Sequence, residues 1–268
     1  MQTTTITPLV ITYNEEANIE RVLSHLAWAP RVVVLDSGST DRTRSICERF
    51  PGVELLTRPF DSFASQCNYG LTHIRSEWCL SIDADYVVPA ATAHEMQEAV
   101  AKAEADAFEA RLVYCIRGRP LRRAILPNRV VLFRTRLGRY VQDGHAHRLS
   151  FDGRLQPLNN PVLHDDRKSI TRWLTSQQTY AEQEAAKILS HSFAELGWPD
   201  RVRRLTLVAP VLVPSFYLFL KGGVLDGWAG LDYAAQRAIA ELVLSINLIE
   251  QRRLWMPKDG VDAQDTVR

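Results

Sequence analysis

The 268-residue chain lacks an excess of charge of either sign, since it has 32 Lys and Arg residues and 31 Asp and Glu residues. This balance argues against a nucleic-acid coat protein and against a generally basic membrane binder, because both need a field of one sign. The four cysteines (Cys47, Cys67, Cys79 and Cys115) have no close-paired spacing. That spacing excludes a CxxC metal site and argues against a disulfide framework, so we expect buried thiols in a reducing compartment.

Sequence signals of several common protein classes are also missing. The first residues, MQTTTITPLVITYNEE, contain no basic segment followed by an apolar stretch, so we expect no signal peptide. The chain has no internal repeat, and the absence of GxxxxGK[ST] and GxGxxG motifs disfavours a P-loop kinase and a Rossmann dehydrogenase. A composition of 46% hydrophobic and 24% charged residues is that of a globular protein.

The first half of the chain alternates short apolar runs with segments of helical periodicity. The expected strands are Thr7–Tyr13, Arg31–Leu35, Val53–Thr57 and Trp78–Ile82. The expected helices are Glu16–Trp28, a segment that begins with Ser39 or Thr40 as N-cap, and Phe63–Ile74. Repeated β-α-β units predict an α/β fold with a mainly parallel sheet, helices on both faces, and ligands at the carboxyl ends of the strands.

The pattern changes after about residue 106. Strand-like pieces at 107–115, 130–134 and 147–151 lack regular helices between them, which predicts an antiparallel extension of the sheet. A long amphipathic helix is expected at Ser169–Leu196, and the segment Arg201–Trp255 is mostly helical and more apolar. We therefore expect a helical C-terminal extension on the α/β unit.

Polar clusters follow three of the predicted strands, at 12–16, 36–41 and 83–85. Each cluster taken singly is also explained by helix capping or by a turn. Taken together they favour a binding site, because the carboxyl ends of parallel strands converge on one crevice. Asp83 and Asp85 would repel one another without a cation or a proton, and Mg²⁺ or Mn²⁺ prefers such oxygen ligands, completed by phosphate oxygens. The pair therefore suits a metal-bound diphosphate.

The ordered motifs TYNEEANI, VVVLDSGSTDRT, FASQCNYGL and WCLSIDADY, between Thr7 and Tyr86, resemble family 2 glycosyltransferases, in particular the branch that acts on lipopolysaccharide core. The resemblance implies a GT-A fold, a nucleotide-diphosphate sugar donor such as a UDP-sugar, Mg²⁺ or Mn²⁺ at a D-x-D motif, and inversion at the anomeric carbon. It also implies a catalytic domain at 1–168, with a donor-binding half (1–105) and an acceptor half (106–168), before the helical region 169–268.

Residue by residue, the resemblance assigns donor binding to nine positions: Thr12, Asn14, Glu15, Asp36, Ser37, Asp41, Gln66, Asn68 and Asp83. Asp36 matches the aspartate that contacts the base, and Asp83 with Asp85 matches the D-x-D pair, with Asp85 as metal ligand. Cys67 stands where the family commonly has lysine, so a lysine contact to the donor is not expected from this position. His164 follows a short apolar run and is a candidate to complete the metal shell or to contact the diphosphate.

An inverting transfer needs a base that removes the proton of the acceptor hydroxyl. Relatives often carry a His-Glu pair after the strand matching 132–134, whereas this chain has DGHAHR at 143–148. Asp143 is our first candidate for the base and His145 the second, and His147, near the position of the family's Glu, stays open.

Eight arginines and no acidic residue occur between Arg117 and Arg139. A solvated loop is the default interpretation, but guanidinium groups also suit phosphates, and the family places its acceptor side here. A phosphate-bearing acceptor would fit, such as lipopolysaccharide core, another glycan or a lipid-linked sugar.

The apolar run Leu205–Leu220 has basic flanks, contains two prolines and is shorter than the ~20 residues of a membrane span. A buried helix, a homo-oligomer contact and an element on the membrane surface are all compatible with it. We favour peripheral association with the inner face of the cytoplasmic membrane.

Two other functions compete with sugar transfer. A nucleotidyltransferase with a related α/β site would release pyrophosphate from a nucleoside triphosphate, so its products would differ. A catalytically idle protein that binds glycolipids or partner subunits is the third interpretation, and the intact D-x-D residues count against it.

Overall fold

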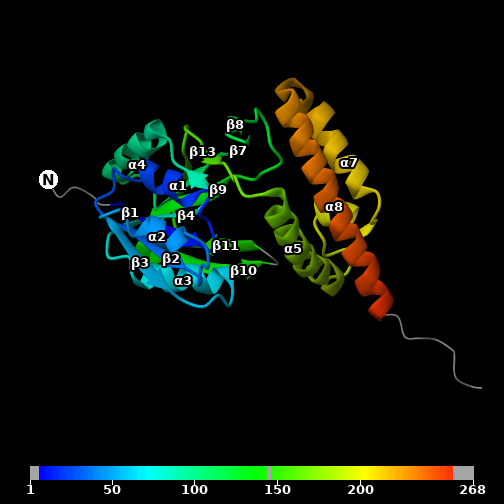
Figure 1. Ribbon diagram of the computed structural model, residues 1–268, viewed down its shortest axis with the longest axis horizontal. Coiled ribbons are helices and arrows are strands. Elements are labelled where there is room, and N and C mark those ends of the chain that lie inside the picture. Colours follow the sequence, from blue (N-terminus) through cyan, green and yellow to red (C-terminus); the bar gives the residue numbers. More distant parts are fainter. Residues whose placement is uncertain (1–5, 144–145, 256–268) are drawn as a thin grey trace, which may run out of the picture.

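The computed structural model describes the backbone of residues 6–143 and 146–255, with side chains except at 142, 143, 146, 147, 254 and 255. In this part of the chain, an α/β unit is built around a mixed sheet, and a group of helices lies at one end of that unit (Figure 1).

The central sheet has seven strands in the order β12-β6-β9-β4-β1-β2-β3. They are β1 (Ile6–Thr12), β2 (Val32–Asp36), β3 (Val53–Thr57), β4 (Trp78–Asp83), β6 (Ala107–Ala110), β9 (Arg129–Arg134) and β12 (Leu155–Pro157). Strands β4, β1, β2 and β3 are parallel, whereas β9 is antiparallel to both β4 and β6. The predicted parallel half with an antiparallel extension is confirmed.

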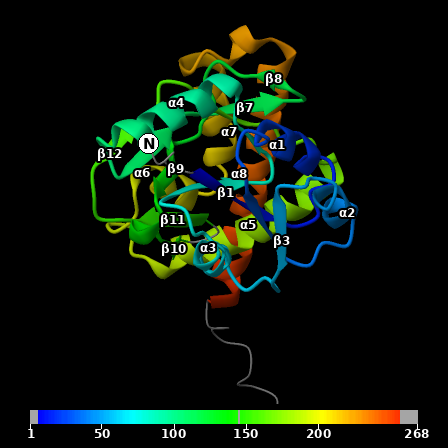
Figure 2. The same ribbon diagram turned by 90° about the vertical axis from the view of Figure 1, so that its left-hand side faces the viewer.

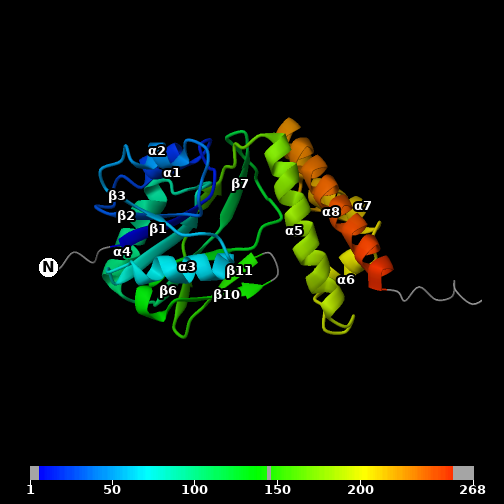
Figure 3. The same ribbon diagram turned by 60° about the horizontal axis from the view of Figure 1, so that its bottom comes forward.

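Helices pack on both faces of this sheet, so its parallel strands are buried on both sides. They are α1 (Ile19–His25), α2 (Thr43–Cys47), α3 (Phe63–Thr72) and α4 (Ala90–Lys102). On one face, Val10 and Val34 of the strands share a core with Met96 of α4 and with residues of α1 and α2. On the other face, Leu9 shares a core with Leu71 of α3, and Figure 3 shows α3 beside the β10 and β11 strands.

Two smaller sheets complete the α/β unit. One has the order β5-β13-β7-β8 and the other is a hairpin of β10 and β11 beside α3. Their bounds are β5 (Tyr86–Val87), β7 (Leu112–Ile116), β8 (Arg119–Pro120), β13 (Val162–His164), β10 (Arg139–Asp143) and β11 (Ala146–Ser150), with a short 3₁₀ turn η1 (Thr135–Leu137) before β10. The single strand predicted at 107–115 is wrong in one respect, because the chain leaves the central sheet after β6 and enters the smaller sheet as β7.

The helices after residue 169 pack on one another behind the sheet (Figure 2). They are α5 (Ile170–Ser190), α6 (Trp198–Arg204), α7 (Ala209–Ser215), the π-helical turn η2 (Phe216–Leu220), the 3₁₀ turn η3 (Gly223–Asp226) and α8 (Trp228–Trp255). Ala185 and Ile188 of α5 form a core with Leu244 and Leu248 of α8. Across the described residues, each helix is too short or too polar to cross a bilayer.

The start of α2 corrects the predicted N-cap. The helix begins at Thr43, and the carboxylate of Asp41 accepts a hydrogen bond from the Thr43 N–H (2.9 Å). Ser39 and Thr40 do not cap it because both lie in the preceding loop and bind Asn14 instead.

All four cysteines are free and buried, as predicted. Burial raises the pKa of the Cys47 and Cys67 thiols to about 12 and that of Cys115 to about 11, so the reactive thiolate is scarce at pH 8. We expect Ellman's reagent at pH 8 to label no thiol of the native protein within minutes, and all four after unfolding in guanidinium chloride. Rapid labelling of a native thiol would contradict this burial.

Candidate functional site

Three polar segments lie at the same edge of the central sheet. The register pairs Thr12 with Asp36 across β1 and β2, and Ile11 with Asp83 across β1 and β4. The loops that follow β1, β2 and β4 therefore leave the sheet side by side, where an α/β sheet binds its ligands.

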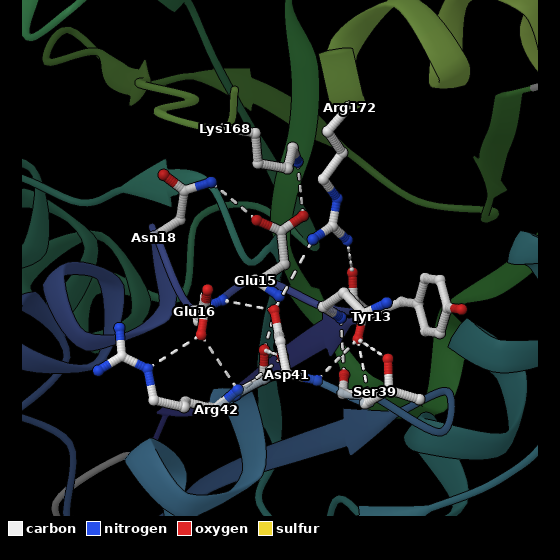
Figure 4. Close-up of polar contacts among 12 residues, drawn as sticks. Tyr13, Glu15, Glu16, Asn18, Ser39, Asp41, Arg42, Lys168 and Arg172 are labelled. Carbon is white, nitrogen blue, oxygen red and sulfur yellow. Dashed lines mark hydrogen bonds and ion pairs between the residues drawn. The ribbon is translucent and has the colours of Figure 1, made fainter. Parts of the chain in front are cut away.

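Asn14 joins the first two loops. Its φ of 54° lies in the left-handed region, which Asn enters more readily than most residues. Its N–H donates to Ser39 Oγ (2.7 Å), and its Oδ1 accepts from the N–H groups of Thr40 (2.7 Å) and Asp41 (3.3 Å). The N–H of Glu16 adds a bond to Asp41 Oδ2 (3.2 Å), so the two loops form one rigid unit (Figure 4).

Asp36 organises the loop after β2. Its buried carboxylate accepts from the N–H groups of Gly38 (3.2 Å) and Ser39 (3.0 Å) and from the Ser39 hydroxyl. These bonds fix the loop that carries Ser37, while a contact of Asp36 with a nucleobase stays a prediction. Thr12 Oγ1, at the end of β1, is buried and makes no hydrogen bond to any described residue.

Gln66 and Asn68 on α3 hold neighbouring segments. Gln66 Nε2 donates to Ser37 Oγ (3.2 Å) and to the carbonyl oxygens of Arg58 (3.0 Å) and Pro59 (3.1 Å). Asn68 exchanges two hydrogen bonds with the backbone of Tyr140 in β10 (2.8 and 2.9 Å). Both amides therefore position the loop and the hairpin, and direct donor binding by them stays a prediction.

Asp83 ends β4 and forms an ion pair. Its Oδ2 lies 2.7 Å from Arg129 Nη1, and the guanidinium of Arg129 also lies over the Tyr86 ring. Within the arginine-rich segment, Arg134 pairs with Glu77 and Asp106. These two arginines thus have structural roles.

Asp85 lies two residues beyond Asp83 and is mostly buried. Its Oδ2 is 3.2 Å from His164 Nε2 and 3.9 Å from Lys168 Nζ, whereas its Oδ1 is buried with no hydrogen bond among the described residues. Burial alone would raise the pKa of Asp85, but His164 and Lys168 hold it well below its usual range. The structure thus brings Asp85 and His164 together, and among the residues it describes no hydrogen-bond donor reaches Asp85 Oδ1.

Lys168 connects this carboxylate to the first loop. Its Nζ lies 2.6 Å from Glu15 Oε1 and 3.3 Å from Asp166 Oδ2, and Asn18 Nδ2 donates to Glu15 Oε2 (2.7 Å) (Figure 4). Burial and the nearby Asp85 carboxylate raise the pKa of Glu15 to about 7, against the opposing effect of Lys168 and Asn18. One buried cation is therefore shared by three carboxylates.

Sequence reasoning missed the role of the segment after His164. Asn18 Nδ2 binds Asp166 Oδ1 (2.9 Å), and the Asp165 N–H donates to the Asp85 carbonyl (3.0 Å). Arg172, in the first turn of α5, donates to the Tyr13 carbonyl (2.8 Å). The only signal in the sequence was the run of charged residues after a short apolar run, and its position beside β1 depends on tertiary packing.

The donor set at Asp85 fits a divalent cation. Asp85 Oδ1 is buried and has no hydrogen-bond partner in the described part of the chain, and His164 Nε2, which lies 3.2 Å from Asp85 Oδ2, would be the second ligand. The described residues contain no cluster of three or more His, Cys, Asp or Glu side chains arranged as a metal site. Two protein ligands suit Mg²⁺ or Mn²⁺ that takes its remaining ligands from a substrate diphosphate and water.

The candidates for the base cannot be placed. Asp143 ends β10 and its backbone pairs with Ala146, but its side chain, all of His145 and the side chain of His147 lie outside the described residues. Their roles remain predictions.

Comparison with known proteins now identifies the chain. A family model described as "Glycosyl transferase family 2" matches residues 8–156, more than half of the sequence. The protein therefore belongs to the family 2 glycosyltransferases, and it is a glycosyltransferase by class, as the sequence motifs predicted.

Two curated relatives agree with this family. An uncharacterized glycosyltransferase of Rickettsia bellii (strain RML369-C) is 24% identical over 199 residues, which cover 69% of this chain and 67% of the relative. The lipopolysaccharide core biosynthesis glycosyltransferase LpsC of Rhizobium meliloti (strain 1021) is 29% identical over 84 residues, only 30% of this chain and 31% of LpsC.

A solved structure supports the fold. The mannosyltransferase PcManGT of Pyrobaculum calidifontis, in complex with GDP-Man and Mn²⁺, superposes with a TM-score of 0.50 at 16% identity, over 92% of this chain and 87% of PcManGT. The predicted GT-A fold, with a mainly parallel sheet and a helical C-terminal region, is confirmed.

Proposed function

We propose that this glycosyltransferase moves a sugar, with inversion, from a nucleotide-diphosphate donor to an acceptor of the cell envelope. One observation carries the proposal: Asp85 Oδ1, beside His164 and Lys168, is buried and has no hydrogen-bond partner within residues 6–143 and 146–255, at the edge of the sheet where an α/β fold binds its ligands. We assign donor binding to residues 1–105 and acceptor binding to 106–168.

In this proposal, the described residues position the donor diphosphate. Asp85 and His164 hold Mg²⁺ or Mn²⁺, whose chemistry is to offset the negative charge that develops on the leaving diphosphate. Lys168, with its ammonium 3.9 Å from Asp85 Oδ2, adds a fixed positive charge near the same group. Ser37, in the loop after β2, and Thr12, at the end of β1, contact the nucleoside.

The acceptor hydroxyl attacks the anomeric carbon on the face opposite the diphosphate, which breaks the sugar–phosphate bond and inverts the configuration. The hydroxyl proton passes to a base, for which Asp143, His145 and His147 remain our candidates. We propose a UDP-sugar as donor. We propose lipopolysaccharide core or a lipid-linked glycan as acceptor, at the inner face of the cytoplasmic membrane.

A thermal-shift screen of UDP-, GDP- and TDP-sugars with and without Mn²⁺ tests this function. A ligand at a hundred times its Kd stabilises the folded state by about 2.7 kcal/mol, so we expect the true donor to raise Tm by roughly 5 °C or more in the presence of Mn²⁺. Pyrophosphate release from a nucleoside triphosphate would indicate a nucleotidyltransferase instead. No shift with any sugar nucleotide at millimolar concentration would contradict the proposal.

A further inference from the structure

The helical region exposes large apolar side chains at one end. Six of the thirteen residues from 219 to 231 are exposed and apolar, and we call them the apolar tip: Phe219, Leu220, Val224, Leu225, Trp228 and Leu231. Phe219 and Leu220 are 74% and 75% exposed. Exposed apolar residues packed this densely are unusual on a monomer and mark an interaction surface.

Close packing beneath the apolar tip fixes its shape. η3 lies against α8 so tightly that a Cβ on Gly230 would come within 1.9 Å of the Gly223 carbonyl oxygen. Tyr217, a residue of η2, is fully buried, and its ring contacts the ring of Tyr233 at a centroid distance of 4.6 Å. The exposed residues are therefore held outward by a well-packed base and are not a partly unfolded end.

Basic side chains lie beside this tip. Arg117, Arg119, Arg122 and Arg123 are all exposed, on the segment that contains β8. The backbone N–H of Arg122 lies 3.2 Å from the buried carboxylate of Asp226 in η3, and Arg122 Nε lies 3.6 Å from the same carboxylate, so Arg122 fixes the segment to the tip. Figures 1 and 2 both show β8 next to the start of α8.

We infer that the apolar tip, with Arg117, Arg119 and Arg123 beside it, forms a docking surface for an anionic lipid membrane. Apolar side chains flanked by cations are the arrangement with which a peripheral protein enters the headgroup region of a bilayer. Each arginine close to an anionic surface strengthens binding by about five-fold. If two copies of the chain met at this surface about a two-fold axis, the arginines of one copy would approach those of the other. The like charges would repel one another, which disfavours such a dimer.

The docking surface is linked to the candidate site by a series of aromatic rings in edge-to-face or tilted contact. Tyr217, under the tip, contacts Tyr233, which lies 5.0 Å from Tyr114, and Tyr114 lies 4.8 Å from the ring of His164. These ring contacts hold the edge of the sheet that carries the candidate site at a fixed position relative to the membrane. The inference extends the proposed function by giving a lipid-linked acceptor a defined direction of approach.

Flotation of the full chain with lipid vesicles tests the surface. We expect binding to 3:1 phosphatidylcholine:phosphatidylglycerol vesicles at 0.1 M salt, and at least about ten-fold weaker binding to pure phosphatidylcholine. The double variants Phe219→Ser/Leu225→Ser and Arg119→Gln/Arg123→Gln should each weaken binding by about ten-fold or more. Leu155→Ser on β12 and Arg44→Gln on α2 change exposed residues elsewhere on the surface, and these variants should bind as the wild type does.

Light scattering at the assay concentration completes the test. The inference is overturned if the wild type does not bind anionic vesicles, if both double variants bind them normally, or if the wild type is a dimer that the Phe219→Ser/Leu225→Ser variant converts to a monomer without lipid. Vesicle binding needs neither donor nor acceptor, so its failure would leave the proposed sugar transfer intact. Failure of the donor screen would equally leave membrane docking intact.

Discussion

Replacing Asp85 with Asn is expected to lower the rate of sugar transfer about a thousand-fold while the protein stays folded. Asn keeps the size of the side chain but removes the charge that would hold a divalent cation, and such a cation contributes several kcal/mol to stabilisation of a leaving diphosphate. The buried Oδ1 of Asp85 has no other partner among the described residues that would account for its position.

Three measurements separate this role from a structural one. Release of the nucleoside diphosphate gives the rate, electron paramagnetic resonance of added Mn²⁺ gives metal affinity, and circular dichroism reports the fold. The matched control is Asp152→Asn, the same chemical change in an exposed loop, which should leave all three unchanged. Treatment of the wild type with EDTA should reproduce the Asp85→Asn defect, and wild-type turnover by Asp85→Asn would refute a metal role for this residue.

Replacing Lys168 with Met is expected to lower kcat/KM about a hundred-fold. The Lys168 ammonium lies among the carboxylates of Glu15, Asp85 and Asp166, at 2.6, 3.9 and 3.3 Å respectively. A hydrogen bond to a charged group contributes roughly 1.5–3 kcal/mol, which corresponds to about 10- to 150-fold in rate or affinity. Removal of this cation also leaves buried charge unbalanced, so the free energy of unfolding should fall by about 3 kcal/mol.

A second substitution distinguishes loss of function from loss of stability. The double variant Lys168→Met/Glu15→Gln also removes the charge of the carboxylate nearest to the ammonium, so it should regain part of the lost stability but not the activity. Lys168→Arg keeps the positive charge and should retain more activity than Lys168→Met, while Lys102→Met on the exposed surface of α4 should have no effect. Equal activity of Lys168→Met and the wild type would show that the ammonium does not act on the donor.

The sequence predicted the donor half of this fold well. Strong β-branched runs followed by turns identified β1 to β4, since a strand buried on both faces must be almost continuously apolar. The repeated β-α-β pattern also predicted that these strands run parallel. It therefore placed Thr12, Asp36 and Asp83, at the strand ends, along one edge of the central sheet. The lack of close-paired cysteines argued against a metal site and a disulfide framework, and so predicted free, buried thiols. All these features are encoded locally or by one repeated unit.

The acceptor side was predicted less well because its elements pair at long range. Nothing in the local pattern of 107–115 shows that the chain changes sheets between β6 and β7. The caps of α2 were also misjudged, since Ser39 and Thr40 bind Asn14, a residue of the preceding β-α loop.

The sequence by itself determined the family, the fold class and the identity of the acidic pair at the end of β4. Only the tertiary structure decided how that pair is used: Asp83 is bound by Arg129, whereas Asp85 faces His164 and shares Lys168 with Glu15. Residues separated by up to 153 positions meet there. Sheet pairing and helix packing bring these distant charged side chains together, so their spacing along the chain does not predict the contact.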